Sequence, residues 1–326
     1  MSSLDVLTKD TALDDHVAVG RSMATRVTIR VPAPGTSEPA IEQACAGALD
    51  LFAAVDRTCT RFDATSNLMQ ANRSPDRWHH VPDHLYHAIE EAKRAHDETH
   101  GRFDPRILRQ LIALGYDRTL PFGEGVLVVD TPMPKRTRAL EPWRPRFREA
   151  ARMVEIGPLP IDLGGIGKGL AVRWAGEVLA MASPSYLIDA GGDCFCAGRM
   201  ADGTPWSVGI EDPFAPREPI ATLVLTDRAA VTSSIRLRRW VTRGQRVHHL
   251  IDPQTGLPGG QGLMSVTVVG KDPARAEVWS KALFIAGRAR ITALAKQRAI
   301  AALWVDQDGR CSMSAAMEPY VQWKKP

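Results

Sequence analysis

The segment IDLGGIGKG, residues 161–169, has the residue types and spacing best suited to binding an anion. Asp162 ends an apolar run, and glycines then surround Lys168 just before a helical pattern begins. Glycine lets backbone amides approach an anion closely, a helix N-terminus carries partial positive charge, and lysine adds a full charge. The segment therefore predicts a site for a phosphate-bearing ligand. The alternative is a glycine-rich turn that binds nothing.

Two well-known phosphate-binding motifs do not describe this segment. A P-loop has Ser or Thr directly after Gly-Lys, whereas Gly169 follows Lys168 here. The dinucleotide-binding fingerprint has the order G-x-G-x-x-G, whereas the order here is G-G-x-G-x-G. Neither nucleotide-binding class is therefore predicted from this segment.

Two later segments add polar groups at predicted strand ends. In the first, Asp189 and Asp193 flank Gly191-Gly192 in DAGGDCFCAG; in the second, VTSS (231–234) places hydroxyls where a strand ends. His249 then stands three residues before Asp252 in HHLIDPQTGLP (248–258). A carboxylate can orient an imidazole that accepts a proton, so we expect His249 to act as a base and Asp252 to pair with it. A structural histidine is the alternative.

The elements that must position these residues belong to an α+β fold. Apolar periodicity predicts helices near 38–56, 82–98, 167–181 and 273–285, and strands near 26–31, 185–190, 206–211, 220–225 and 264–269. Several neighbouring strands lack an intervening helix, which favours mixed or antiparallel sheets flanked by helices over a doubly wound sheet. We expect a polar tail over residues 1–20 and one domain over 21–326, with a sub-lobe boundary or an insertion in the Pro/Arg-rich stretch near 130–150.

Composition excludes several classes of protein. The 326 residues are 44% hydrophobic and 24% charged, with a net charge of +4, which indicates neither a disordered chain nor a nucleic-acid-binding one. No apolar run is long enough to cross a membrane. The acidic first 16 residues are unlike a secretory signal, so we expect a cytoplasmic protein. Five cysteines, with Cys194-x-Cys196 too closely spaced for an ordinary zinc site, predict free thiols.

Taken in order, seven segments resemble the ApbE-type FAD:protein FMN transferases. They are RFD (61–63), GRFDP (101–105), DLGGIGKG (162–169), AGGD (190–193), VTSS (231–234), HHLIDPQTGLP (248–258) and SVTVV (265–269). The resemblance runs from about Met23 to Gly287 and implies an α+β fold with FAD in a central cleft. It also implies the activity: with Mg²⁺, FMN is moved from FAD to a Ser or Thr of an acceptor protein through a phosphodiester bond.

The resemblance implies roles for individual residues. His249 matches the base that activates the acceptor hydroxyl. The positions matching the FAD site are Met23, Phe103, Asp104, Asp162, Gly165, Lys168, Gly191, Gly192, Asp193, Thr232, Ser233 and Leu250. The metal-site positions correspond to Gly167, Glu277 and Lys281.

Lys281 departs from the family pattern, which has threonine at this position and aspartate at the position of Glu277. An ammonium repels a cation and cannot coordinate it while protonated. Three functions are then possible. In the first, the chain transfers FMN, either because Lys281 stands in for part of the metal charge or because Glu277 still binds Mg²⁺ with waters. Otherwise the chain is a non-catalytic FAD-binding protein, or an FAD pyrophosphatase giving FMN and AMP.

Overall fold

The computed structural model describes residues 4–10, 15–32, 37–123, 127–131 and 141–325. Over these residues the largest element is a nine-stranded sheet in the order β1-β2-β3-β7-β8-β11-β16-β17-β18, with every neighbouring pair antiparallel. The strands are β1 (Leu4–Asp10), β2 (Asp15–Ser22), β3 (Thr25–Pro32), β7 (Tyr186–Ala190), β8 (Cys194–Ala197), β11 (Arg228–Ser234), β16 (Leu263–Gly270), β17 (Ala301–Asp306) and β18 (Cys311–Met313).

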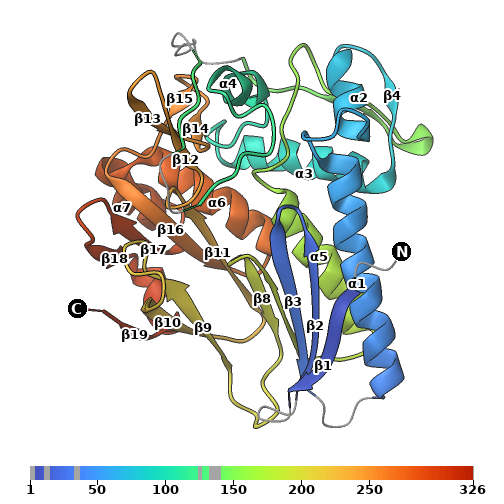
Figure 1. Ribbon diagram of the computed structural model, residues 1–326, viewed down its shortest axis with the longest axis vertical. Helices are drawn as coiled ribbons and strands as arrows, with labels where there is room; N and C mark the ends of the chain where they lie inside the picture. The colour runs from blue at the N-terminus through green and yellow to red at the C-terminus, as the bar shows by residue number, and fades with distance from the viewer. Residues whose placement is uncertain (1–3, 11–14, 33–36, 124–126, 132–140, 326) are drawn as a thin grey trace.

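Helices cover one face of this sheet (Figure 1). Along α1 (Glu38–Cys59), buried residues recur every three or four positions, from Ile41 to Val55, and this apolar stripe packs on α5 (Gly167–Ala180) and on β2 and β3. The helix α6 (Pro273–Ala286) contacts α5, β11 and β16. The other helices are α2 (Asn67–Arg73), α3 (Asp83–Glu98), α4 (Leu108–Ala113) and α7 (Arg288–Gln297).

A three-stranded sheet, β19-β10-β9, covers the opposite face. Along β17, Ala302 and Trp304 join the core shared with α6, whereas Leu303 and Val305 join the core shared with the small sheet. Since successive side chains of a strand point to opposite faces, this alternation places the two covers on opposite sides. The strands of the small sheet are β9 (Trp206–Glu211), β10 (Pro219–Leu225) and β19 (Val321–Lys324).

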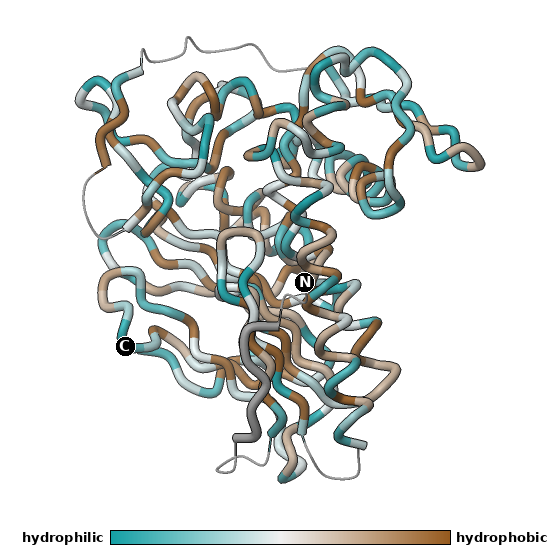
Figure 2. The backbone as a smooth tube through the Cα atoms, turned by 45° about the vertical axis from the view of Figure 1, so that its right-hand side comes forward, coloured by the Kyte–Doolittle hydropathy of each residue, from teal (hydrophilic) through white to brown (hydrophobic). Residues whose placement is uncertain are grey.

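Short hairpins and helices complete the described part of the chain. The remaining strands are β4 (His79–His80), β5 (Arg146–Arg148), β6 (Met153–Glu155), β12 (Arg239–Thr242), β13 (Gln245–His248), β14 (Ile251–Asp252) and β15 (Leu257–Pro258), with 3₁₀ turns at Glu149–Ala151 and Ala315–Tyr320. Figure 2 shows apolar residues recurring along the strands and helices in the middle of the molecule. Over the residues described, no helix combines the length and apolarity that spanning a membrane requires.

The predicted α+β class with antiparallel sheets is confirmed, but the predicted tail over residues 1–20 is wrong. Residues 4–10 and 15–22 form β1 and β2, which pair in sequence onto β3. Strand pairing outweighs the acidic composition, because β2 is stabilised by β3 along its whole length. In the predicted boundary near 130–150, residues 132–140 lie outside the described part of the chain, and the β5–β6 hairpin follows them. All five cysteines are free thiols.

Candidate functional site

A cleft of about 1200 Å³ collects residues from distant parts of the chain. It is lined by the β2–β3 turn, the segment after α1, the glycine loop before α5, the β7–β8 turn, the end of β11, edge strand β9, and the side chains of His249 and Lys281. Its volume exceeds the usual range of small-molecule sites, about 300–1,000 Å³. The cleft is therefore large enough for a dinucleotide.

The glycine loop leads directly into the N-terminus of α5. Gly164, Gly167 and Lys168 line the cleft, and α5 begins at Gly167. Gly169 lies against α6: a Cβ at this position would fall 2.6 Å from the Ala274 Cα, so only glycine permits the two helices to approach this closely. The N-terminus of α5 and the Lys168 side chain together place positive charge on the floor of the cleft, which suits phosphate. The Gly164 amide donates within the loop to Asp162 Oδ1, and the Gly167 amide donates to the Leu163 carbonyl.

The β7–β8 turn forms the next wall. Gly191 and Gly192 have φ values of 69° and 90°, and the Gly192 amide donates to Asp189 Oδ1 over 2.8 Å. A Cβ on Gly191 would fall 2.0 Å from Thr25 Oγ1, so a side chain at Gly191 would clash as well as strain the backbone. Burial raises the pKa of the Asp189 carboxyl above its ordinary value.

Asp193 and the strand β11 link this turn to the glycine loop. The Asp193 carboxylate forms an ion pair with Lys168 and accepts from the Thr232 amide over 3.3 Å. The Thr232 and Ser233 side chains bond to neighbouring elements: Thr232 Oγ1 lies 2.8 Å from Thr267 Oγ1, and Ser233 Oγ lies 2.7 Å from Ser280 Oγ. Both residues line the cleft, although each hydroxyl has a protein partner.

A strained turn brings Met23 to the cleft. Ser22 pairs with Thr25, so Met23 and Ala24 form a two-residue hairpin loop, with φ values of 52° and 57°. Such a turn normally uses Gly or Asn, because both central residues have positive φ. The Met23 amide donates to Asp56 Oδ2 over 2.7 Å, which fixes the turn on α1.

Arg61 is a cleft residue for which sequence reasoning gave no role. Its guanidinium Nη1 donates to the Tyr116 carbonyl over 2.6 Å, and Nε lies 3.5 Å from Asp162 Oδ1. Nη2 is buried and has no hydrogen-bond partner, although Arg61 is only 7% exposed. In the sequence, the only sign of a role for Arg61 was its place in the family-like segment RFD (61–63). In the structure, the unpaired Nη2 donor marks Arg61 as a candidate ligand-binding residue.

His249 lines the same cleft, half-buried, as a neutral base. Its Nδ1 lies 3.3 Å from the Arg238 carbonyl, which can only accept, so Nδ1 carries the proton and Nε2 keeps its lone pair. Burial, followed by electrostatic interaction with Arg238, His248 and Lys281, holds the pKa of His249 well below 6.5. The imidazole is thus free to take a proton at neutral pH.

Comparison with known proteins identifies the family. The model of the ApbE family matches residues 23–304. This chain belongs to the ApbE family. It is 25% identical over 317 residues to a FAD:protein FMN transferase of Klebsiella pneumoniae, covering 94% of this chain and 86% of that protein. A Treponema pallidum FAD:protein FMN transferase is 32% identical over 170 residues, covering 49% of this chain and 47% of that protein.

Solved structures share the ApbE fold. The crystal structure of the ApbE protein from Thermotoga maritima superposes with a TM-score of 0.82 at 24% identity, covering 95% of this chain and all of that one (100%). The flavin transferase ApbE from Vibrio cholerae gives a TM-score of 0.73 at 23% identity, covering 94% of this chain and 99% of that one. The predicted fold class is thereby confirmed by structures as well as by topology.

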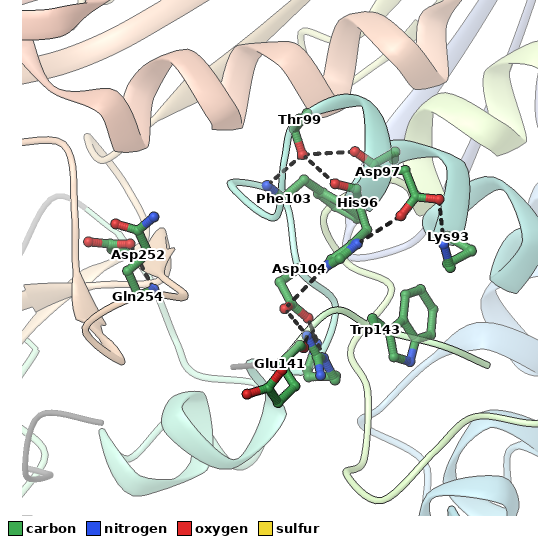
Figure 3. Close-up of polar contacts among 12 residues, drawn as sticks. Lys93, His96, Asp97, Thr99, Phe103, Asp104, Glu141, Trp143, Asp252 and Gln254 are labelled. Carbon is green, nitrogen blue, oxygen red and sulfur yellow. Dashed lines mark hydrogen bonds and ion pairs between the residues drawn. The ribbon is translucent and has the colours of Figure 1, made fainter. Parts of the chain in front are cut away.

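The predicted pairing of His249 with Asp252 is wrong for this ApbE chain. Asp252 directs its carboxylate into its own turn, where Oδ1 accepts from the Gln254 amide over 3.0 Å (Figure 3). Its Oδ2 lies 3.3 Å from Thr255 Oγ1. Asp-Pro-x-Thr-Gly is a turn sequence, and an aspartate that opens a turn bonds most readily to the amide two residues on. The Arg238 carbonyl orients His249 instead.

Phe103 and Asp104 support the cleft from behind rather than lining it. Asp104 is buried in an ion pair with Arg106, 2.6 Å from Nη2, and lies 3.7 Å from His96 Nε2 (Figure 3). Phe103 packs under the glycine loop, where its ring would lie 2.9 Å from a Cβ on Gly165. Gly165 and the buried Leu250 are likewise absent from the lining. The structure places these four residues outside the lining, and a direct contact between them and a ligand stays a prediction.

The residues at the family's metal positions do not fit a divalent ion. Glu277 is fully buried: Oε2 accepts from the Gly169 amide over 2.7 Å, and Oε1 lies 3.0 Å from Lys281 Nζ. Both carboxylate oxygens are thus engaged, and an ammonium stands beside them. Across the described ranges no cluster of three His, Cys, Asp or Glu side chains has metal-binding geometry. Gly167 lines the cleft nearby.

Proposed function

We propose that this chain takes FAD as its substrate and transfers FMN to a Ser or Thr hydroxyl of an acceptor protein. One observation carries the proposal: a single cleft is lined both by Lys168 at the start of α5 and by His249, a neutral histidine whose Nε2 keeps its lone pair. The relatives named FAD:protein FMN transferases support it.

The chemistry follows from these two groups. His249 Nε2 takes the proton of the acceptor hydroxyl, and that oxygen attacks the phosphorus of the FMN portion. A phosphorus–oxygen bond forms as the pyrophosphate phosphorus–oxygen bond breaks, and AMP leaves with the bridging oxygen. The Lys168 side chain and the N-terminus of α5 stabilise negative charge on the transferred phosphate. With water in place of the hydroxyl, the same steps give FMN and AMP.

The test compares His249→Ala with His87→Ala, a histidine on α3 that does not line the cleft. Purified protein is incubated with FAD and peptides that each carry one Ser or Thr, and AMP release and FMN attachment are measured by mass spectrometry. We expect His249→Ala to lower transfer at least 100-fold with FAD affinity changed less than threefold. Because the pKa of His249 lies well below 6.5, wild-type transfer should persist as the pH falls through 6.5.

Each other outcome has a defined meaning. An unchanged rate in His249→Ala would assign the histidine a structural role and refute the proposed base. FAD binding with neither transfer nor AMP release would favour a non-catalytic flavin-binding protein. This is the second candidate function because Lys281 and Glu277 form an ion pair at the family's metal positions. AMP release with no attached FMN would indicate an FAD pyrophosphatase.

A further inference from the structure

Lys281 places a fixed positive charge in the cleft. It lies one helical turn after Glu277 on α6, its ammonium bonds to Glu277 Oε1 over 3.0 Å, and its side chain is 15% exposed. The aliphatic stem passes along the glycine loop, since its Cδ would lie 3.4 Å from a Cβ on Gly165. The ammonium is therefore held beside the loop expected to bind phosphate.

The Glu277 carboxylate holds this lysine and leaves no vacancy for a cation. Its second oxygen accepts from the Gly169 amide in the first turn of α5, so the helix N-terminus also stabilises the negative charge. A divalent ion binding here would have to displace the ammonium and break a buried ion pair, which is costly. The site is built around the lysine.

The Lys281 ammonium still has N–H donors that can bond to a ligand. A protonated lysine has three N–H donors, and Glu277 is its one hydrogen-bond partner among the residues that the structure describes. The other cation of the floor, Lys168, is already paired with Asp193. Because Lys281 lines the cleft, its remaining donors are available to an anion there.

We propose that the Lys281 ammonium neutralises the FAD pyrophosphate in place of a divalent cation, so that this chain binds FAD and transfers FMN without Mg²⁺. The inference rests on the proposed function. It assigns Lys281 to binding the pyrophosphate, with Glu277 and the Gly169 amide as the groups that position it.

Three ligands separate a charge effect from a general loss of the site. FAD and ADP contain the pyrophosphate, whereas riboflavin has the flavin ring and no phosphate. Dissociation constants are measured by flavin fluorescence, and for ADP by competition, with EDTA and with Mg²⁺. Wild type should bind FAD within twofold under both conditions. Lys281→Gln should weaken FAD and ADP at least tenfold and riboflavin less than twofold, while Lys296→Gln, an exposed lysine on α7, should change none.

A double variant covers the case in which Lys281→Gln destabilises the fold by leaving Glu277 unpaired. Glu277→Asp with Lys281→Thr removes the ammonium and supplies two oxygen ligands, so its FAD affinity should rise at least tenfold on adding Mg²⁺. Wild-type FAD binding that falls tenfold in EDTA and returns with Mg²⁺ would overturn the inference and leave the proposed function standing. Equal losses of FAD and riboflavin affinity in Lys281→Gln would also overturn it. No FAD binding by wild type under any condition would refute the proposed function itself.

Discussion

At the scale of single residues, the guanidinium of Arg61 stands out because its surroundings hold it rigidly and leave one donor unused. Its central carbon lies 4.1 Å from the Phe62 ring centroid and 4.3 Å from that of Tyr116. Contacts to the Tyr116 carbonyl and to Asp162 fix its orientation. A buried donor without a partner is costly, so an acceptor from a ligand in the cleft would stabilise it.

Arg61→Lys should therefore weaken FAD binding about tenfold or more. Lysine keeps the charge but loses the fork that carries Nη2, and a hydrogen bond to a charged group contributes about 1.5–3 kcal/mol. FAD titration followed by flavin fluorescence measures the effect. Arg118→Lys is the matched control, since Arg118 is an exposed arginine that does not line the cleft. Equal FAD affinity in wild type and Arg61→Lys would mean that water alone satisfies Nη2.

Residue types predicted that the glycine loop and His249 belong to one cleft, but not which group orients the histidine. The glycines, Lys168 and the start of α5 follow one another in the chain, so a short segment was enough to predict positive charge at this turn. The partner of His249 is the Arg238 carbonyl, eleven residues earlier in the chain and directly before β12, the strand that pairs with β13. A backbone carbonyl has no sequence signature. Asp252 looked suitable only because it lay nearby in sequence.

At the scale of elements, the β2–β3 hairpin combines a position at the cleft with an unfavourable turn. Ala24 adopts a φ of 57° and is exposed, so its methyl group contributes little packing. An L-residue in this region costs about 1–2 kcal/mol, whereas glycine adopts it freely at a cost of about 0.5–1 kcal/mol in chain entropy. The turn is held in place by neighbouring contacts such as that between the Met23 amide and Asp56.

Ala24→Gly should accordingly stabilise the fold by ~0.5–1 kcal/mol, measured by urea unfolding. Ala293→Gly is the opposite control: Ala293 is exposed in the middle of α7, where glycine should destabilise by about 0.5–1 kcal/mol. If both substitutions destabilise equally, the strain assigned to the turn does not exist. FAD affinity of Ala24→Gly, measured alongside, reports whether the strained turn also tunes the site.

Periodicity predicted the amphipathic elements closely and missed those stabilised mainly by pairing. The helix predicted near 273–285 is α6, Pro273–Ala286, and the strand predicted near 206–211 is β9, Trp206–Glu211. The strands β1 and β2 were missed because their stability comes from pairing in order onto β3. Short hairpins such as β14–β15 are two residues per strand, too short for any periodic signal.

At the scale of the whole molecule, one sheet joins the two halves that form the cleft. The core around α1 and α5 and the core around α6 pack on the same face of the nine described strands, through β2, β3 and β7 in one half and β11, β16 and β17 in the other. The helices α5 and α6 also contact each other, at Gly169 among other places. Met23 and Lys281, far apart in sequence, therefore line one cleft.

Because the cleft depends on both halves, unfolding should be a single transition that FAD shifts as a whole. FAD at 100 times its dissociation constant should raise the free energy of unfolding by ~2.7 kcal/mol. Urea denaturation is followed by tryptophan fluorescence and by far-UV circular dichroism, with and without FAD, and the two probes should give coincident curves. Two transitions of which FAD moves only one would show that the halves unfold independently and that one half alone carries the site. The stabilisation should also grow with the logarithm of the FAD concentration, because a ligand that binds only the folded state acts by mass action.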